Sequence, residues 1–257
     1  MRFARFGLLL LTFLGGLWVY FAQGDDPKPA PEDPFIGLIA TARAELINHA
    51  PFPPSSRAPL TAARIHLQAG RPERARALIL PELEGEWSAE AHYLLGILES
   101  RAQLWQRTLD ALTLALTPGA AYPEKPIAPF RLARALEETG RIPAARLAYQ
   151  LDHDLSGDGE ALFRLGLLDI EAGHFPKAKA NLENALGRFT QPQARSRTLA
   201  ALSDISLASN DLSQARDLLE QAAVLHQHPE LLHRLAQLCR RMGDTEAAAG
   251  YAAEAGE

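Results

Sequence analysis

A short pattern of turn-forming and small residues recurs along this chain and constrains its fold more than any other feature. The turn positions are spaced by 33, 37, 33, 37 and 33 residues: Gly70, Gln103, Gly140, Gly173, Asn210 and Gly243. A repeat of this length predicts a solenoid of helical hairpins, so the expected fold class is all-α. Such a solenoid offers an extended surface to a partner and rarely supplies a catalytic pocket.

Small residues flank every turn at fixed distances. Seven positions before the turns stand Ala63, Gly96, Ala133, Gly166, Ser203 and Ala236. Five positions after them stand Ala75, Thr108, Ala145, Ala178, Ala215 and Ala248. Small side chains at both places let the two helices of a hairpin approach closely, and a bulky residue there should cost ~1–3 kcal/mol through overpacking. The leucines eight positions before the turns are expected in the core: Leu95, Leu132, Leu165, Leu202 and Leu235.

The repeats occupy residues 56–257, and two intervals within them are longer than the others. The extra residues fall near 117–125 and 187–193, where we expect longer links or longer helices. Before the repeats, apolar residues recur at helical spacing over residues 35–50 and predict a single helix that ends at Pro51. This helix is expected to cap the apolar face of the first repeat.

The amino terminus predicts a membrane anchor. Arg2 and Arg5 precede an uncharged run over residues 6–22, which as a helix would be ~25 Å long and near the lower limit for crossing a bilayer. The positive-inside rule makes residues 1–5 a cytoplasmic tail and exports the rest. The Pro-rich acidic segment 23–34 is expected to act as an extended linker.

A cleaved signal peptide is the alternative for the same segment. A cut after Ala22 would place Tyr20 where a small residue is favoured, which is why an uncleaved anchor is preferred. Both alternatives export the repeats. The expected location is the bacterial inner membrane, with a single span, a cytoplasmic amino terminus and the repeats in the periplasm.

The pattern resembles the tetratricopeptide repeat (TPR) family over about residues 56–256. Two units carry the resemblance best, AEAHYLLGILESRAQLWQRTLDALTLAL from Ala89 and GEALFRLGLLDIEAGHFPKAKANLENAL from Gly159. Both contain the Leu-Gly pair, the aromatic residue after the turn and the final Ala-Leu. Gln103 and Thr108 depart from the usual Gly and Ala. The resemblance implies a right-handed superhelix of about six hairpins, with a groove lined by the first helices.

That implied groove contains the candidate binding residues. Three aromatic residues stand ten positions before successive turns, and arginines stand near them: Arg64, Tyr93, Phe130, Arg131, Arg134, Phe163 and Arg164. Aromatic rings flanked by guanidinium groups suit a peptide that carries apolar side chains and a carboxylate. In the alternative interpretation, the rings pack between neighbouring repeats and the arginines are solvated or pair with Glu137 and Glu138.

Three other features are assigned structural roles. Residues 152–160 resemble the start of a calcium loop, but Phe163 stands where the closing Glu is needed, and turn chemistry explains the segment. The histidines near His228 fall in an expected inter-repeat turn, without a supporting carboxylate for a metal. Cys239 is expected in the core. No metal site or cofactor is therefore predicted.

The predicted function is a membrane-tethered scaffold or adaptor for protein–protein interaction. The sequence contains no nucleophile elbow, phosphate loop or zinc-protease motif, so an enzyme and a small-molecule substrate are not expected. The net charge of −5 argues against binding to nucleic acid. The partner is expected to be a protein or peptide, with membrane contact through residues 6–22. The alternative function is an accessory chaperone of a secretion, envelope-assembly or cytochrome-maturation machinery.

Overall fold

The computed structural model describes residues 33–48 and 57–256, which are helical and contain no strand within those two ranges. The chain divides into two units, Met1–Pro34 and Phe35–Glu257, and the second contains the whole array of hairpins. The predicted tail 1–5, the predicted span 6–22 and most of the linker lie outside the described residues. None of the described helices has both the length and the apolar character needed to span a bilayer.

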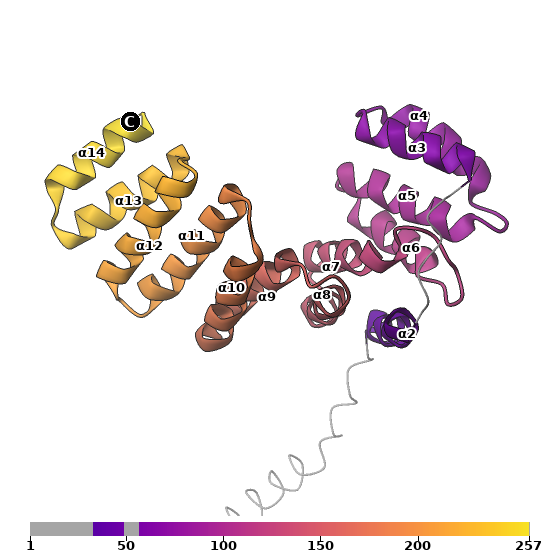
Figure 1. Cartoon of the computed structure of the whole chain (residues 1–257), viewed down its shortest axis with the longest axis horizontal. Helices are drawn as coiled ribbons and strands as arrows, with labels where there is room; N and C mark the ends of the chain where they lie inside the picture. The colour runs from indigo at the N-terminus through magenta and orange to yellow at the C-terminus, as the bar shows by residue number, and fades with distance from the viewer. Residues whose placement is uncertain (1–32, 49–56, 257) are drawn as a thin grey trace, which may run out of the picture. The chain divides into compact units, whose positions relative to one another are not determined.

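Twelve of the α-helices form six hairpins that follow one another in chain order (Figure 1). The first helices are α3 (Ala58–Gln68), α5 (Ser88–Arg101), α7 (Ala128–Glu138), α9 (Gly159–Glu171), α11 (Pro192–Ala208) and α13 (Pro229–Met242). The second helices are α4 (Pro72–Ile79), α6 (Trp105–Ala115), α8 (Ile142–Ser156), α10 (Phe175–Arg188), α12 (Leu212–Leu225) and α14 (Thr245–Ala255). Short 3₁₀ helices, η1 (Leu80–Glu82) and η2 (Lys125–Ile127), follow α4 and precede α7.

All six predicted turns have a left-handed backbone. Their φ angles lie between 57° at Gln103 and 82° at Gly243. At Gly140 the amide donates to Glu137 O at 2.9 Å and the next amide, of Arg141, donates to Leu136 O at 2.8 Å. This pair of bonds is a Schellman motif, and the same two bonds recur at the other five turns. Each second helix begins two residues after its turn.

The predicted close approach within the hairpins is confirmed. A Cβ added at Gly96 would lie 2.8 Å from Leu112 Cδ2, and one added at Gly166 would lie 2.6 Å from Leu182 Cγ. The alanines at the equivalent places, such as Ala63 and Ala133, are completely buried. The leucines eight positions before the turns are buried as expected, except Leu95, which is half-buried against the core.

The two longer intervals are accommodated in different ways. In the first, α6 ends at Ala115 and an irregular link leads through η2 to α7. In the second, α10 continues to Arg188 and α11 has 17 residues, so the extra length is helical. The sequence left both outcomes open.

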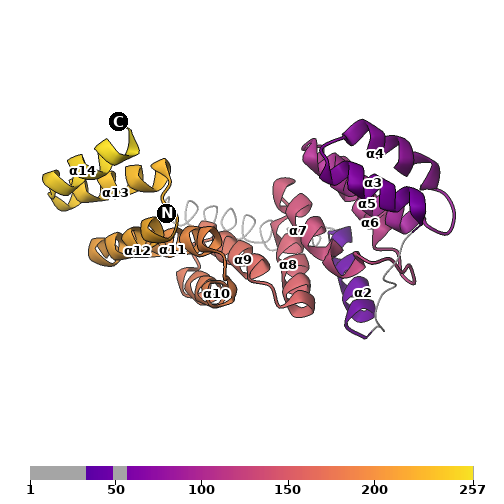
Figure 2. The ribbon, with the colours of Figure 1, turned by 45° about the horizontal axis from the view of Figure 1, so that its top comes forward.

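The amino-terminal helix α2 (Pro34–Asn48) forms as predicted but occupies a different place from the one expected. Figure 1 shows α5 and α6 between α2 and the first hairpin, and Figure 2 shows α2 beside α8. Its Glu45 accepts a hydrogen bond from Lys125 Nζ at 2.7 Å, and its Arg43 pairs with Asp154 of α8 at 2.6 Å. The helix therefore packs on α8 and on the link between the second and third hairpins, which supplies its buried polar partner.

Candidate functional site

The first helices share one surface, which we call the first-helix face. It consists of the residues six, nine, ten and thirteen positions before each turn. Side chains at these positions contact each other from one hairpin to the next, as in the pairs Arg64–Glu90, Arg131–Tyr93 and Arg234–Asp204. All seven predicted binding residues stand at these positions of the face.

Tyr93 does not offer its ring to a partner, which corrects one part of the predicted site. Its side chain is 1% exposed and packs against Tyr122, with the ring centroids 5.5 Å apart. Tyr122 belongs to the irregular link, which has no counterpart in the 33-residue intervals and covers the tyrosine. Burial raises the pKa of Tyr93, and the neighbouring Arg131 opposes this shift. The phenol therefore stays neutral and acts as a hydrogen-bond acceptor.

The two phenylalanines also pack between neighbouring elements, as the alternative interpretation proposed. Phe130 is half-buried and meets Tyr149 edge-on at 5.6 Å. Phe163 is 6% exposed and meets Phe189 edge-on at 6.5 Å. The guanidinium of Arg197 lies 4.7 Å from the Phe163 ring centroid, in a cation–π arrangement. Of the three predicted aromatic residues, only Phe130 is half-buried rather than buried.

Three of the four predicted arginines are engaged by carboxylates. Arg64 donates to Glu90 and to Glu124, the latter at 2.6 Å. Arg134 donates to Glu138 at 3.0 Å. Glu90 is almost completely buried, so Arg64 compensates a charge that would otherwise be costly to bury.

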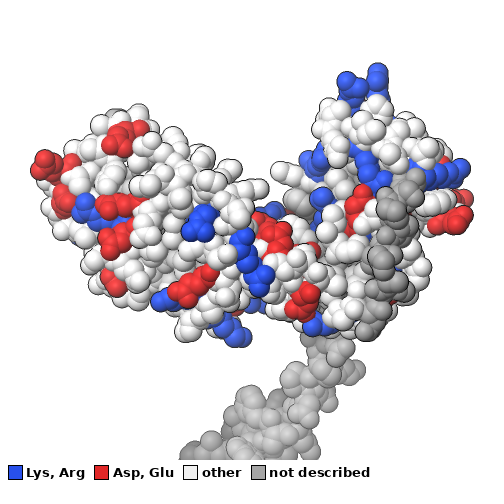
Figure 3. Space-filling model, in the orientation of Figure 1, with Lys and Arg blue, Asp and Glu red and all other residues white. Residues whose placement is uncertain are grey.

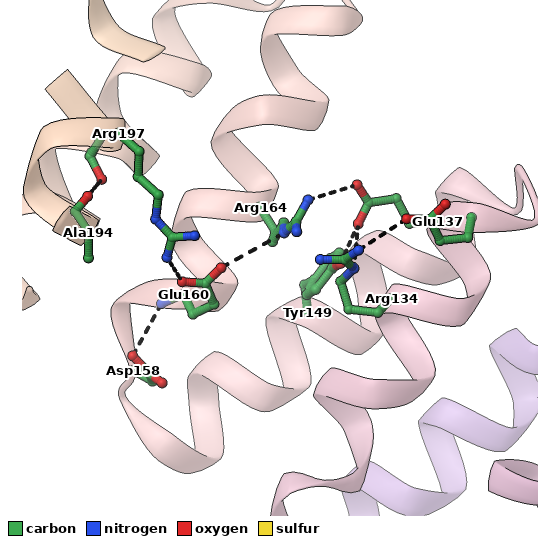
Figure 4. A network of polar contacts seen from close by, with 10 residues as sticks. Arg134, Glu137, Tyr149, Asp158, Glu160, Arg164, Ala194 and Arg197 are labelled. Atoms are coloured by element: carbon green, nitrogen blue, oxygen red, sulfur yellow. Dashed lines mark hydrogen bonds and ion pairs between the residues drawn. The ribbon is translucent and has the colours of Figure 1, made fainter. Parts of the chain in front are cut away.

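The pairing extends along the centre of the first-helix face as a ladder of alternating charges (Figure 4). Arg164 Nη1 lies 3.5 Å from Glu137 and its Nε lies 3.9 Å from Glu160. Glu160 also pairs with Arg197 of the next hairpin. Burial raises the pKa of Glu137, while a hydrogen bond from Tyr149 and the charge of Arg134 lower it. Much of the predicted positive charge is therefore neutralised within the chain.

Arg131 is different from the other predicted arginines. Its Nε donates to the Tyr93 hydroxyl at 3.0 Å and its guanidinium carbon lies 5.8 Å from that ring. Among the described residues, no carboxylate lies within ion-pairing distance of Arg131. An open pocket of about 250 Å³ adjoins it and is also lined by Phe130 and Ile127 and by three acidic residues, Asp152, Asp158 and Glu160. Glu160 is already paired with Arg197, and Asp158 caps α9. The terminal nitrogens of Arg131 thus remain available to an acceptor from outside the chain.

A second pocket on the same face was missed by the sequence analysis. Its volume is about 380 Å³, and residues from α9, α11 and α13 line it around Ala200 and Ala201. The signal that could have revealed it is the absence of large side chains at these two positions of the fifth hairpin.

The calcium-like segment and the histidine cluster have structural roles. Asp152 lies within α8, which continues to Ser156, and Asp158 caps α9 by accepting from Glu160 N at 3.2 Å. Burial, with a smaller contribution from Asp158, raises the pKa of Asp152 to about 6. His228 caps α13 by accepting from Glu230 N at 3.3 Å. In the part of the chain that the structure describes, no group of His, Cys, Asp and Glu residues is arranged to hold a metal.

Comparison with known proteins gives the fold a wider context. No protein-family model and no curated protein matches the chain. PilF of Pseudomonas aeruginosa is 18% identical, with 83% of this chain and 90% of that chain covered at a TM-score of 0.63. PilW, described as a widely conserved type IV pilus biogenesis factor, is 16% identical, with coverages of 76% and 90% and a TM-score of 0.64. MamA from Desulfovibrio magneticus RS-1 is 15% identical, with coverages of 67% and 94% and a TM-score of 0.55.

At these identities the likeness concerns the fold alone. The matches span most of this chain and nearly all of each similar structure, and they agree with the six hairpins and their left-handed turns. The chain therefore has the fold of a TPR-type helical repeat protein.

Proposed function

We propose that this protein is a membrane-tethered scaffold whose first-helix face binds a peptide or an envelope protein. The single observation that carries the proposal is the state of the Arg131 side chain. Its guanidinium is half-buried and fixed by Tyr93, yet it pairs with no carboxylate among the described residues. A fixed guanidinium with unused donors binds a carboxylate with little loss of conformational freedom.

The surroundings of Arg131 favour a protein segment over a small charged ligand. Phe130 is half-buried and Ile127 is 45% exposed, and both line the pocket beside Arg131. An acidic side chain on Arg131 and an apolar side chain on these two residues would be neighbours in one bound segment. The other predicted arginines remain proposed contacts at the edge of this site: Arg64, Arg134 and Arg164. Their ion pairs also stabilise the surface around it.

The tether is proposed from the sequence of residues 6–22. An uncleaved span there would place the amino terminus in the cytoplasm and the hairpins in the periplasm of a bacterial cell. Confinement to the membrane raises the effective concentration of the face near membrane-bound partners, so weak individual contacts suffice. Figure 3 shows basic and acidic side chains interspersed on the visible face, a distribution that does not favour nucleic acid. We propose no enzymatic activity and no small-molecule substrate.

An accessory chaperone of a secretion, envelope-assembly or cytochrome-maturation machinery is the second candidate. The likeness to PilW, which is described as a pilus biogenesis factor, favours an assembly role of this kind. A chaperone binds many unfolded clients transiently and suppresses their aggregation. A scaffold is isolated with one partner in a fixed proportion.

Site-specific photo-crosslinking in native membranes tests the proposal. A photoreactive residue replacing Ile127 lies beside Arg131, whereas one replacing Val224, which is 88% exposed on the second helix α12, serves as the matched control. We expect one discrete crosslinked partner from position 127 and none from position 224. Equal crosslinking from both positions would contradict binding at the first-helix face, and many products from position 127 would favour the chaperone.

A further inference from the structure

The fifth hairpin interrupts the row of large side chains on the first-helix face. Ten positions before the turns, the other five hairpins carry Leu60, Tyr93, Phe130, Phe163 and His233. The fifth hairpin carries Ala200 at this position and Ala201 at the next. Three of the other hairpins have arginine at that next position. The two short alanine side chains therefore leave a space at positions where the other hairpins carry larger side chains.

This space is the pocket of about 380 Å³ between α9, α11 and α13. Its apolar lining combines the two alanines with Phe163, Leu167 and Leu231. The volume lies within the usual range for small-ligand sites and is sufficient for one large apolar side chain with its main-chain groups.

Two guanidinium groups stand at the rim of the pocket, and both are held in place. Arg197 pairs with Glu160 and lies over the Phe163 ring at 4.7 Å. Arg234 donates through Nη2 to Asp204, to Ser203 Oγ at 3.0 Å and to Ala200 O at 3.2 Å. Both arginines donate only through Nη2 among the described residues. Arg197 is an exposed residue, and the other nitrogens of the half-buried Arg234 are not buried without a partner, so solvent reaches the remaining donors of both groups.

Two acidic side chains also line the pocket, and they differ in their pairing. Asp204 is compensated by Arg234, and its burial raises its pKa while the guanidinium opposes that shift. Glu230, at the start of α13, makes no ion pair within the described residues. The guanidinium side of the rim is therefore the place for an anion, and Glu230 limits how tightly the anion binds.

We propose that this pocket binds an apolar side chain of a partner segment, with an adjoining carboxylate held by Arg197 and Arg234. The inference rests on the proposed scaffold function, because it assigns partner chemistry to the same first-helix face. It adds an anchoring point two hairpins away from Arg131. An extended acidic-apolar segment would engage both points along the row of first helices.

Three small leucine derivatives with different net charges test the chemistry of this pocket. N-acetyl-leucine is an anion, N-acetyl-leucinamide is neutral and leucinamide is a cation. Each is titrated at one fixed pH into the full chain, and the alanine methyl signals of Ala200 and Ala201 are followed by NMR. We expect saturable shifts for the anion and a dissociation constant about tenfold lower than that of the neutral amide, the effect of one charge-assisted contact.

Variants locate the binding and test the rim. Ala200→Leu fills the pocket, and large residues at the same position in the other hairpins indicate that it folds. Ala253→Leu on α14 is the matched control, since residue 253 is exposed and does not line the pocket. We expect Ala200→Leu to abolish the shift of Ala201 and the control to preserve it. Arg234→Gln should remove the preference for the anion, and Glu230→Gln should tighten anion binding.

Opposite outcomes overturn the inference. Binding that survives Ala200→Leu places the probe elsewhere, and tightest binding of the cation reverses the proposed charge. An absence of saturable shifts with all three probes removes the site. None of these results affects crosslinking of a partner at position 127, so failure of this inference is distinguishable from failure of the scaffold proposal.

Discussion

Lys125 Nζ lies 2.7 Å from Glu45 Oε1, and this contact joins the irregular link to helix α2. The lysine side chain is fully buried and also donates to the carbonyl oxygens of Thr117 and Ala120, at 3.2 and 2.7 Å. A buried ammonium is tolerated only when its charge and its donors are satisfied. The pair therefore fixes α2 against the link between the second and third hairpins.

Removal of this lysine should destabilise the fold strongly. Lys125→Met deprives the largely buried Glu45 of its ammonium partner, and we expect a loss of ~3–5 kcal/mol in the free energy of unfolding. Lys179→Met removes the exposed pair with Glu183 and should cost less than ~1 kcal/mol. Urea denaturation measures both. If the loss of the buried ion pair is the cause, adding Glu45→Leu to Lys125→Met should restore stability. Similar effects of Lys125→Met and Lys179→Met would contradict this explanation.

The helix contact inside the fourth hairpin should not tolerate even one added methyl group. Gly166→Ala places its Cβ against Leu182 at 2.6 Å, and the resulting overpacking is expected to cost ~1–3 kcal/mol. Gly187→Ala, also in a helix but with no atom within 4 Å of the added Cβ, should be neutral or stabilising by up to ~1 kcal/mol. Thermal unfolding of the two variants distinguishes them, and an equal response would show that the contact adapts freely.

Glycine should stabilise the protein at the two turns that lack it. Gln103 and Asn210 have φ angles of 57° and 59°, where a side chain other than that of glycine is strained. Gln103→Gly is expected to stabilise the protein by ~1 kcal/mol, and Asn210→Gly by less because Asn tolerates this conformation better. Gly140→Ala should instead destabilise the protein, because alanine is strained at the positive φ of this turn. Chemical denaturation of the three variants tests the order, and a destabilised Gln103→Gly would show that its side chain has a role the turn does not explain.

Asp152 should make stability fall as the pH rises. Its pKa of about 6 in the folded protein exceeds the ordinary value of 3.8, so between these values the folded state binds the extra proton. The penalty for the buried carboxylate grows as the pH rises through this window and reaches up to ~3 kcal/mol above it. Asp152→Asn should therefore be more stable than the parent at pH 8 and nearly equal to it at pH 4. The same difference at both pH values would exclude titration of this group as the cause.

Arg131 should contribute more to partner capture than the paired arginines. Arg131→Ala removes the available guanidinium, and we expect at least about a fivefold loss of crosslinked partner, the effect of one charge-assisted contact. Arg134→Ala, whose guanidinium already pairs with Glu138 at 3.0 Å, should lose less. Quantitative recovery of the partner after crosslinking from position 127 measures both. A larger loss in Arg134→Ala would contradict the special role of Arg131 and favour a site to which the paired arginines contribute as well.

Local features of this fold were predictable from the sequence because they depend on residues close together in the chain. A left-handed residue at Gly140 ends one helix and begins the next, and small residues seven before and five after the turn set the hairpin contact. The helical spacing of apolar residues over 35–50 likewise predicts an isolated helix, and α2 forms there. It does not say where that helix packs, because Lys125 stands 80 positions away from Glu45.

The character of the candidate site was decided by tertiary structure. Exposure of a ring and pairing of a guanidinium depend on side chains from neighbouring hairpins and from a link that does not repeat. Tyr93 is buried because Tyr122 covers it, and Arg164 is neutralised because Glu137 of the preceding hairpin lies within 3.5 Å. The sequence by itself thus determined the repeat, its turns and the surface that carries the candidate residues. Only the stacking of the hairpins decided which residues on that surface remain available to a partner, since this selection requires contacts between residues more than 25 positions apart.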